Sequence, residues 1–247
     1  MSTQTRIIEV RQNVLKQNDI LARALRQRFH EAGVFVVSMV SSPGAGKTAL
    51  LERTLTLLRQ QFRVAALVGD LATENDAARL ARSQAPVKQI LTGTVCHLEA
   101  AMVQNALEGW KLDDLDFLFI ENVGNLVCPS SYDLGEDLRL VLMSVTEGED
   151  KPLKYPDMFA AASLMIINKI DLMPYVTFDV ARCIQYAQRV NPLIEVILVS
   201  ATRGDGMVDW LDWLLPPRGA GYRRTKPGRP RHAGALVPLA RIANPTP

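Results

Sequence analysis

The sequence predicts an α/β protein in which helices cover both faces of a mostly parallel sheet. Short apolar runs alternate with amphipathic runs between residues 34 and 215, a pattern typical of repeated strand–helix units. Near the start of this region, an apolar run at 34–40 leads through a turn of small residues into a helix-like run at 48–59. That strand–turn–helix unit is typical of P-loop folds, which bind nucleotide phosphates.

The remaining elements follow in order along the chain. Strands are expected at 34–40, 63–68, 87–91, 115–120, 138–145, 164–167 and 194–199. Helices are expected at 6–31, 48–59, 75–83, 97–107, 178–190 and 207–215. In the first helix, apolar residues recur at helical spacing and Gly33 follows as a C-cap. Because ligands of open α/β sheets bind at the carboxyl ends of the strands, polar residues that follow the strands are the functional candidates.

The turn after the first strand has the sequence SSPGAGKT, residues 41–48. Its small residues allow the backbone amides to surround phosphate oxygens at the positive end of a helix. The expected phosphate-binding residues are Gly44, Ala45, Gly46, Lys47 and Thr48. The lysine is expected to reach the β- and γ-phosphates, and the threonine hydroxyl to bind Mg²⁺. Ser41 replaces the usual first glycine of the motif.

The strand at 164–167 is followed by Asn168-Lys169-Ile170-Asp171, the spacing of the guanine-binding motif of GTPases. The Asp171 carboxylate can accept from two guanine donors, whereas adenine presents an acceptor at N1. Asn168 is expected to brace the loop, and the stem of Lys169 to lie along the ring. A backbone amide in the loop of Ser200 and Ala201 is expected to bind guanine O6. The sequence therefore predicts GTP, against the alternative of a plain turn rich in Asn and Asp.

Acidic residues follow two further strands. Asp70 is expected to bind magnesium through water or to orient the attacking water. Glu121 opens Glu-Asn-Val-Gly, which resembles the Asp-x-x-Gly motif of many GTPases, and the amide of Gly124 is expected to contact the γ-phosphate. Thr73 and Asp76 are expected in a mobile switch, although Asp76 equally suits the first turn of a helix. The catalytic candidates are Lys47, Asp70, Glu121 and Gly124, and the magnesium ligands are Thr48, Asp70 and Glu121.

Three soft ligands fall in loops near the predicted nucleotide. Cys96 and His97 are adjacent where a helix is expected to begin, and Cys128 comes soon after Gly124. Two thiols and an imidazole suit Zn²⁺ or Ni²⁺. The alternative, small buried apolar cysteines, stays open from the residues alone. Cys183, inside a helix-like run, is assigned to the core.

The composition is that of a globular protein. No apolar run approaches the roughly 20 residues needed to span a membrane. The first ten residues, MSTQTRIIEV, lack the apolar region of a secretory signal. Three cysteines cannot form a closed disulfide set, so a reduced cytoplasmic setting is expected.

Three segments are expected along the chain. Residues 1–33 form an amphipathic helix packed on the domain, 34–215 the GTPase domain with its metal site, and 216–247 a basic, Pro/Gly-rich, disordered tail. The tail carries seven Arg or Lys and no acid, which leaves −5 on the rest of a chain of net charge +2. A solubilising tail is favoured over one that binds an acidic partner or nucleic acid, because Tyr222 alone could stack on bases.

Several stretches together resemble the HypB family of hydrogenase maturation GTPases. These stretches are SSPGAGKT, GDLATENDAARL, GTVCHLEA, FIENVGNLVCPSSYDLGE, SVTEGEDKPLKYP and NKIDL. The resemblance implies a P-loop GTPase of the dimerising SIMIBI class that assists nickel insertion into [NiFe]-hydrogenase, with slow turnover. It also implies a metal site at the subunit interface, for which the matching residues are Cys96, His97 and Cys128. Expected partners are a second copy, another maturation factor and the hydrogenase large-subunit precursor, with no nucleic acid or membrane.

The chain departs from some members of that family. The residues before Cys96 contain no cysteine and one histidine, His30, so the N-terminal nickel-storage motif of those members is not expected. One alternative is a metal carrier that uses GTP only as a conformational switch. Another is the urease-type nickel GTPase, whose Cys-Pro-His motif is not matched because Ser130 follows Cys128-Pro129.

Overall fold

The computed structural model describes residues 3–71 and 75–215. Thr73 and the tail at 216–247 lie outside the described residues. The strands form one all-parallel sheet in the order β3-β2-β4-β1-β5-β6-β7. Their bounds are β1 Phe35–Ser41, β2 Val64–Asp70, β3 Val87–Leu91, β4 Phe117–Glu121, β5 Leu138–Ser144, β6 Leu164–Asn168 and β7 Glu195–Leu198.

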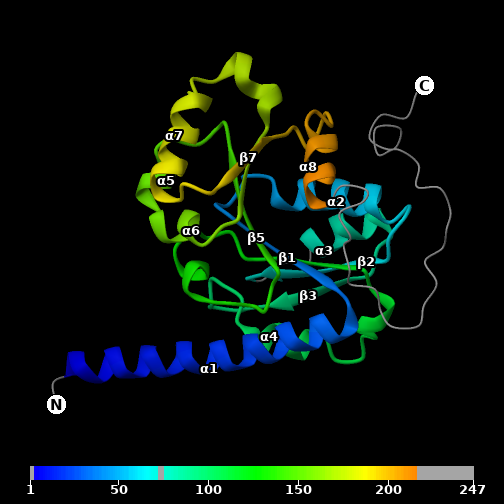
Figure 1. Cartoon of the computed structure of the whole chain (residues 1–247), viewed down its shortest axis with the longest axis vertical. Helices are drawn as coiled ribbons and strands as arrows, with labels where there is room; N and C mark the ends of the chain where they lie inside the picture. The colour runs from blue at the N-terminus through cyan, green and yellow to red at the C-terminus, as the bar shows by residue number, and fades with distance from the viewer. Residues whose placement is uncertain (1–2, 72–74, 216–247) are drawn as a thin grey trace.

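Helices connect the strands (Figure 1). The α-helices are α1 Thr3–Ala32, α2 Lys47–Leu58, α3 Asn75–Leu80, α4 Ala100–Ala106, α5 Lys151–Lys154, α6 Pro156–Ala160, α7 Val180–Val190 and α8 Met207–Leu214. Short 3₁₀ turns occur at Ala81–Ser83, Leu112–Asp114, Cys128–Ser131 and Ile170–Tyr175. No helix within the described residues is long and apolar enough to cross a bilayer.

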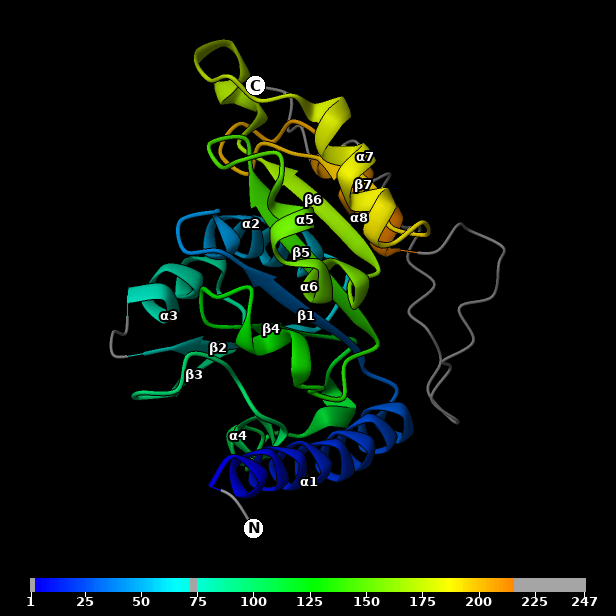
Figure 2. The ribbon, with the colours of Figure 1, turned by 90° about the vertical axis from the view of Figure 1, so that its left-hand side faces the viewer.

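Apolar side chains on both faces of the sheet bury it against helices, as the alternating pattern predicts. On one face, α2 and α8 pack on the sheet through Leu51, Leu55 and Trp210. On the other, α1 and α4 pack beneath β1, β2 and β4 through Phe29, Val103 and Ala106. The same face is covered beyond β5 by α6 and α7. Figures 1 and 2 show α1 lying alongside α4 at the edge of the molecule.

The predicted strands and the α/β class are confirmed, with strand ends shifted by at most two residues. The start of the helix predicted at 97–107 is wrong, because α4 begins at Ala100. Cys96 and His97 therefore lie in a loop ahead of the helix. The short helices α5 and α6 were not predicted, because Pro152 and Pro156 at their first turns resemble loop residues in sequence.

The strand order brings the candidate residues to one edge. β1 lies between β4 and β5, and Met39 of β1 is in register with Glu121 at the end of β4. β2 neighbours β4 and ends at Asp70, while β6 ends at Asn168 two strands away from β1. The loops that follow these strands therefore meet around the N-terminus of α2.

Candidate nucleotide and metal sites

The loop between β1 and α2 has the backbone shape of a phosphate cradle. Gly44 and Gly46 have φ angles of 76° and 97°, which side chains disfavour. A Cβ at residue 46 would also lie 2.5 Å from the Asn168 side-chain nitrogen. Lys47 and Thr48 begin α2, so the amide-rich end of the helix faces the loop. The loop can therefore surround an anion with backbone amides, and only glycine fits at position 46.

Lys47 is buried within this cradle, with 8% of its surface exposed. Its ammonium donates to Ser41 Oγ over 2.9 Å, and the Ser41 hydroxyl donates to the Ser42 carbonyl. Burial lowers the pKa of Lys47, while nearby carboxylates, Glu121 foremost, oppose that change. The serine that replaces the usual glycine thus gives the lysine a hydrogen-bond partner inside the protein. Phosphate oxygens would offer the ammonium stronger, charged acceptors.

Glu121 is a buried carboxylate at the centre of the site. Oε1 accepts a hydrogen bond from Thr48 Oγ1 over 2.7 Å. Oε2 is buried and has no hydrogen-bond partner among the described residues. Burial raises the pKa of Glu121 to about 7, although the charge of Lys47 and the Thr48 hydrogen bond act in the opposite direction. An unsatisfied carboxylate oxygen beside a threonine hydroxyl fits Mg²⁺, which takes oxygen ligands.

Asp70 and Gly124 flank this centre. Asp70 ends β2, and its Oδ1 accepts from the Leu71 amide over 2.6 Å. Gly124 lies against the phosphate loop, because a Cβ there would be 3.1 Å from the Cα of Pro43. The segment after β4 therefore packs directly against the loop. Asp76, the remaining acid, lies in the first turn of α3, 4.0 Å from Arg79.

The guanine-motif residues connect the phosphate loop to the loop after β7. Asn168 is buried; its Nδ2 donates to the Ala45 carbonyl and its Oδ1 accepts from the Ala201 amide, over 3.0 and 3.1 Å. Lys169, in the left-handed conformation with φ 61°, donates to the Gly44 carbonyl over 2.7 Å. Asp171 accepts from Ser200 Oγ over 2.6 Å. These bonds hold the two loops in one arrangement, with the Asp171 carboxylate oriented by a serine.

The structure brings Cys96, His97 and Cys128 together. Their ligand atoms all lie within 4.8 Å of one another, and the two sulfurs are 3.2 Å apart. The hydrogen bond of Cys96 to Cys128, with burial, raises the pKa of Cys96. A metal would have to displace thiol protons to bind. Two thiols and an imidazole at this separation fit Ni²⁺ or Zn²⁺ by donor chemistry.

His97 is prepared for a ligand on geometric grounds. Both ring nitrogens are buried and neither has a hydrogen-bond partner among the described residues. The ring lies against Tyr132 with centroids 4.0 Å apart, and Nε2 is 3.3 Å from Glu99 Oε1. A bound metal would satisfy one nitrogen, and the other could then donate toward the carboxylate, as metal-bound histidines commonly do.

Two asparagines link this trio to the strand that ends at Glu121. Asn122 Oδ1 accepts from the Leu98 and Val123 amides, over 3.0 and 2.9 Å. Asn125 Nδ2 donates to the Cys96 carbonyl and to Cys96 Sγ, over 3.3 and 3.1 Å. The loop of Cys96 and His97 and the segment that packs on the phosphate loop are therefore joined by direct hydrogen bonds.

Sequence reasoning missed several residues of the site. Lys151 donates to the Ser42 hydroxyl and pairs with Glu147 at 3.0 Å, so α5 reaches the phosphate loop. Asn122 and Asn125 were also not singled out. The stretches that contain Asn122, Asn125 and Lys151 were quoted only for their resemblance to the HypB family. Cys183 is buried in the core, as predicted, and burial raises its pKa to about 12.

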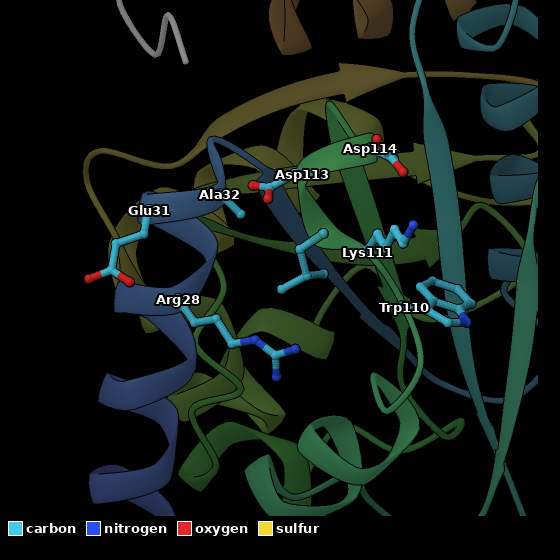
Figure 3. Close-up of a pocket in the computed structure, with 8 residues that line it drawn as sticks. Arg28, Glu31, Ala32, Trp110, Lys111, Asp113 and Asp114 are labelled. Carbon is cyan, nitrogen blue, oxygen red and sulfur yellow. The ribbon is translucent and has the colours of Figure 1, made fainter. Parts of the chain in front are cut away.

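A pocket of about 620 Å³ lies at the opposite end of the sheet (Figure 3). It is lined by the end of α1 and by the turn before β4, including Arg28, Trp110 and Asp113. None of the candidate residues lines it. The chemistry of the carboxyl-end loops therefore locates the site better than cavity size does.

The fold and these loops define a P-loop nucleotide-binding protein, with a cluster of two thiols and an imidazole that could hold a metal beside the nucleotide loops. Residues 35–198 match the model of the CobW/HypB/UreG nucleotide-binding domain, and the chain belongs to this family. It is 52% identical to the hydrogenase maturation factor HypB of Azotobacter vinelandii, over 96% of this chain and 78% of that protein.

Further comparisons agree. The chain is 54% identical to HypB of Escherichia coli K12, over 88% of this chain and 75% of that protein. A crystal structure of HypB from Helicobacter pylori in complex with nickel aligns with a TM-score of 0.76 and 42% identity. That alignment covers 80% of this chain and 93% of the other. The resemblance to HypB stated from the sequence motifs is confirmed.

Proposed function

We propose that this chain is a GTP-hydrolysing metallochaperone that carries nickel for the maturation of [NiFe]-hydrogenase. The observation that carries the proposal is the cluster of Cys96, His97 and Cys128, joined by Asn122 and Asn125 to the segment that contacts the phosphate loop. The names of the relatives support the biological role, and the nickel complex of one relative supports the choice of metal. Nickel is the cargo in this proposal, and GTP and Mg²⁺ are bound for hydrolysis.

The proposed chemistry of hydrolysis uses the residues of the phosphate cradle. Lys47 and the amides of Gly44, Ala45 and Gly46 bind and neutralise the phosphates, and Lys151 approaches from α5. Thr48 and Glu121 are the proposed oxygen ligands of Mg²⁺, with Asp70 acting through water. Magnesium supplies charge neutralisation at the phosphates when it is bound. Gly124 senses the γ-phosphate through its contact with Pro43.

Guanine is the proposed base because of Asp171. Its carboxylate is held by Ser200, and Asn168 positions the neighbouring loops. Lys169 lies beside the phosphate loop, with its stem available to the ring. Ala201 contributes a backbone amide to the same loop.

A second copy of the chain is the proposed first partner. Three ligands are one fewer than a closed tetrahedral site usually has, and a twofold interface can share ligands between copies. Val127 beside Cys128 and Leu91 at the end of β3 are each 61% exposed, so apolar surface is available near the ligands. The further partners are another maturation factor and the hydrogenase large-subunit precursor. The cytoplasmic setting and the three-segment division of the chain remain parts of the same proposal.

The test is GTP turnover and metal binding by the purified protein. Wild type is expected to bind one nickel ion per site and to hydrolyse GTP slowly. Cys96→Ala is expected to lose nickel binding and to retain GTP hydrolysis. Asp70→Ala is expected to lower the rate more than the affinity for GTP, since it acts in the transition state. Metal binding and GTP binding without turnover would favour the carrier alternative. Unchanged metal affinity in Cys96→Ala would refute the metal site.

A further inference from the structure

Asn18 of α1 joins the two ligand-bearing segments of the metal cluster. Its side chain is buried, with 5% exposed. Oδ1 accepts from the Ala100 amide over 2.8 Å, and Nδ2 donates to the Asp133 carbonyl over 2.8 Å. Ala100 follows Cys96 by four residues, and Asp133 follows Cys128 by five. One amide side chain therefore bonds to both segments.

The bond to Ala100 replaces a missing helix cap. Ala100 is the first residue of α4, and the N-cap residue Glu99 makes no side-chain capping hydrogen bond. The first amides of a helix have no partner within the helix. Asn18, in α1, supplies a hydrogen-bond acceptor for the first amide of α4. Leaving such a buried donor unsatisfied costs about 1–3 kcal/mol, so the start of α4 depends on α1.

The bond to Asp133 is reinforced by a second contact from α1. Arg26 donates twice from Nη2 to the Asp133 carboxylate, over 2.6 and 2.8 Å. Tyr132, the preceding residue, is the one whose ring lies against His97. The segment after Cys128 is therefore fixed to α1 at the point where it touches the histidine ligand.

α1 itself is a firm support for these contacts. Leu25 and Phe29 are buried between α1 and the sheet, in the same apolar cluster as Leu98 and Val103. Figures 1 and 2 show α1 running alongside α4. The helix also lies outside residues 35–198, the region matched by the family model. Its role at the metal cluster is therefore not part of the shared nucleotide-binding domain.

We propose that Asn18 is a positioning residue of the metal site, and that α1 sets the spacing between Cys96–His97 and Cys128. The proposal rests on the proposed function, in which these three residues bind nickel. Replacing a residue that holds metal ligands in position typically changes metal affinity 10- to 100-fold. Because the hydrogen-bond partners of the Asn18 side chain, the Ala100 amide and the Asp133 carbonyl, lie in the ligand-bearing segments, its replacement should affect metal binding and leave nucleotide binding of the metal-free protein unchanged.

The experiment measures Ni²⁺ affinity and the Co²⁺ absorption spectrum of full-length variants. Asn18→Ala is expected to weaken Ni²⁺ binding by about 10-fold or more, to alter the Co²⁺ thiolate bands, and to leave GDP affinity unchanged. In the metal-free protein, hydrogen exchange at residues 98–102 should accelerate. Asn18→Asp has nearly the same size and keeps the acceptor for Ala100. It should preserve protection at 98–102 while losing affinity, because the bond to Asp133 is lost.

Two controls separate positioning from general stability. Asn13→Ala replaces an exposed asparagine of the same helix and should behave as wild type. Phe29→Leu loosens the packing of α1 on the sheet but keeps both hydrogen bonds of Asn18, so it should lose stability while losing less nickel affinity than Asn18→Ala. If Asn18→Ala keeps wild-type nickel affinity, or if Phe29→Leu loses as much, the proposal is overturned. Cys96→Ser tests the metal site itself. Nickel binding that survives in Asn18→Ala and also in Cys96→Ser refutes the metal site. Nickel binding that is lost in Cys96→Ser but kept in Asn18→Ala refutes only the role of Asn18.

Discussion

Glu121 combines three properties that are seldom found together in one carboxylate. It is buried, it bonds to the Thr48 hydroxyl, and its second oxygen is unsatisfied among the described residues. A carboxylate in this state favours its protonated form until a cation arrives. Below its pKa of about 7, Glu121 is therefore mostly protonated in the nucleotide-free protein, and binding of magnesium at the proposed site would release that proton.

This state of Glu121 makes stability depend on pH. Its pKa is raised from 4.5 to about 7 on folding, so the unfolded chain ionises first as pH rises. Stability is then fully present below about pH 4.5 and falls as pH rises to about 7, by up to about 3 kcal/mol. Glu121→Gln should remove this fall, and at pH 8 it should be the more stable protein without nucleotide. Denaturant unfolding of both proteins at pH 5, 6, 7 and 8 measures the difference. If the unfolding free energies of wild type and Glu121→Gln change with pH in parallel, the assignment of this pH dependence to Glu121 is contradicted.

Asp171 should decide the base. Asp171→Asn should weaken GTP binding and favour xanthosine triphosphate, because xanthine has an oxygen where guanine has its amine. The loss for GTP should be about 10²-fold or more, since a buried donor is left unpaired. Competition binding with both nucleotides measures the shift. Asp113→Asn, at the opposite end of the sheet, is a matched control away from the nucleotide. Equal GTP affinity in wild type and Asp171→Asn would exclude Asp171 from the base site.

Among the elements, the phosphate loop and the base loops act as one unit because Asn168 bonds to both. Asn168→Ala removes the bonds to Ala45 and Ala201 and leaves their buried partners unsatisfied. A loss of about 2 kcal/mol or more in unfolding free energy is expected, with weaker binding of GTP and GDP alike. Thermal unfolding and nucleotide titration together test this.

If Asn168 stabilises only its own loop and does not couple the two loops, Asn168→Ala should give a different result. In that case, stability falls while GDP affinity stays equal to that of the surface control Asn13→Ala. Lys169→Ala serves as a second comparison, because it removes a single bond, to the Gly44 carbonyl.

The elements of the sheet were predictable because a parallel sheet covered on both faces requires continuous apolar runs. The phosphate and guanine motifs were also found, since each lies within a few neighbouring residues. The contacts of Asn18 with Asp133, of Asn122 with the Leu98 amide and of Lys151 with Ser42 were not predicted, because these partners lie 24 to 115 residues apart and no local spacing encodes them. The start of α4 was misplaced for the same reason: its cap comes from another helix.

At the scale of the whole molecule, the proposed nucleotide and metal sites share the edge where β1, β2, β4 and β6 end. In the proposed function, a change at the γ-phosphate would reach Gly124 first and the cysteines next, through Asn122 and Asn125. Coupling between two sites is reciprocal in free energy. Nickel should therefore strengthen the GTP-dependent assembly of two copies, and assembly should strengthen nickel binding.

Sedimentation with a non-hydrolysable GTP analogue, with and without nickel, measures this coupling. Wild type should dimerise more strongly with both ligands than with either one, by about 5-fold or more. Cys96→Ala should keep the nucleotide effect and lose the nickel effect. Cys183→Ala, which removes a core thiol, should match wild type. A nickel effect that persists in Cys96→Ala would contradict coupling through this cluster.

The 3.2 Å separation of the Cys96 and Cys128 sulfurs also bears on redox chemistry. An exogenous disulfide such as oxidised glutathione can oxidise the two thiols by thiol–disulfide exchange. A bond forms between the Cys96 and Cys128 sulfurs, and the exogenous disulfide is cleaved and released as two thiols. The product has no thiolate to offer nickel, so oxidation closes the site without touching the nucleotide. Nickel that already holds the sulfurs should protect them. Mass spectrometry after treatment should find the loss of two hydrogens in the metal-free protein, and far less of it in the loaded one.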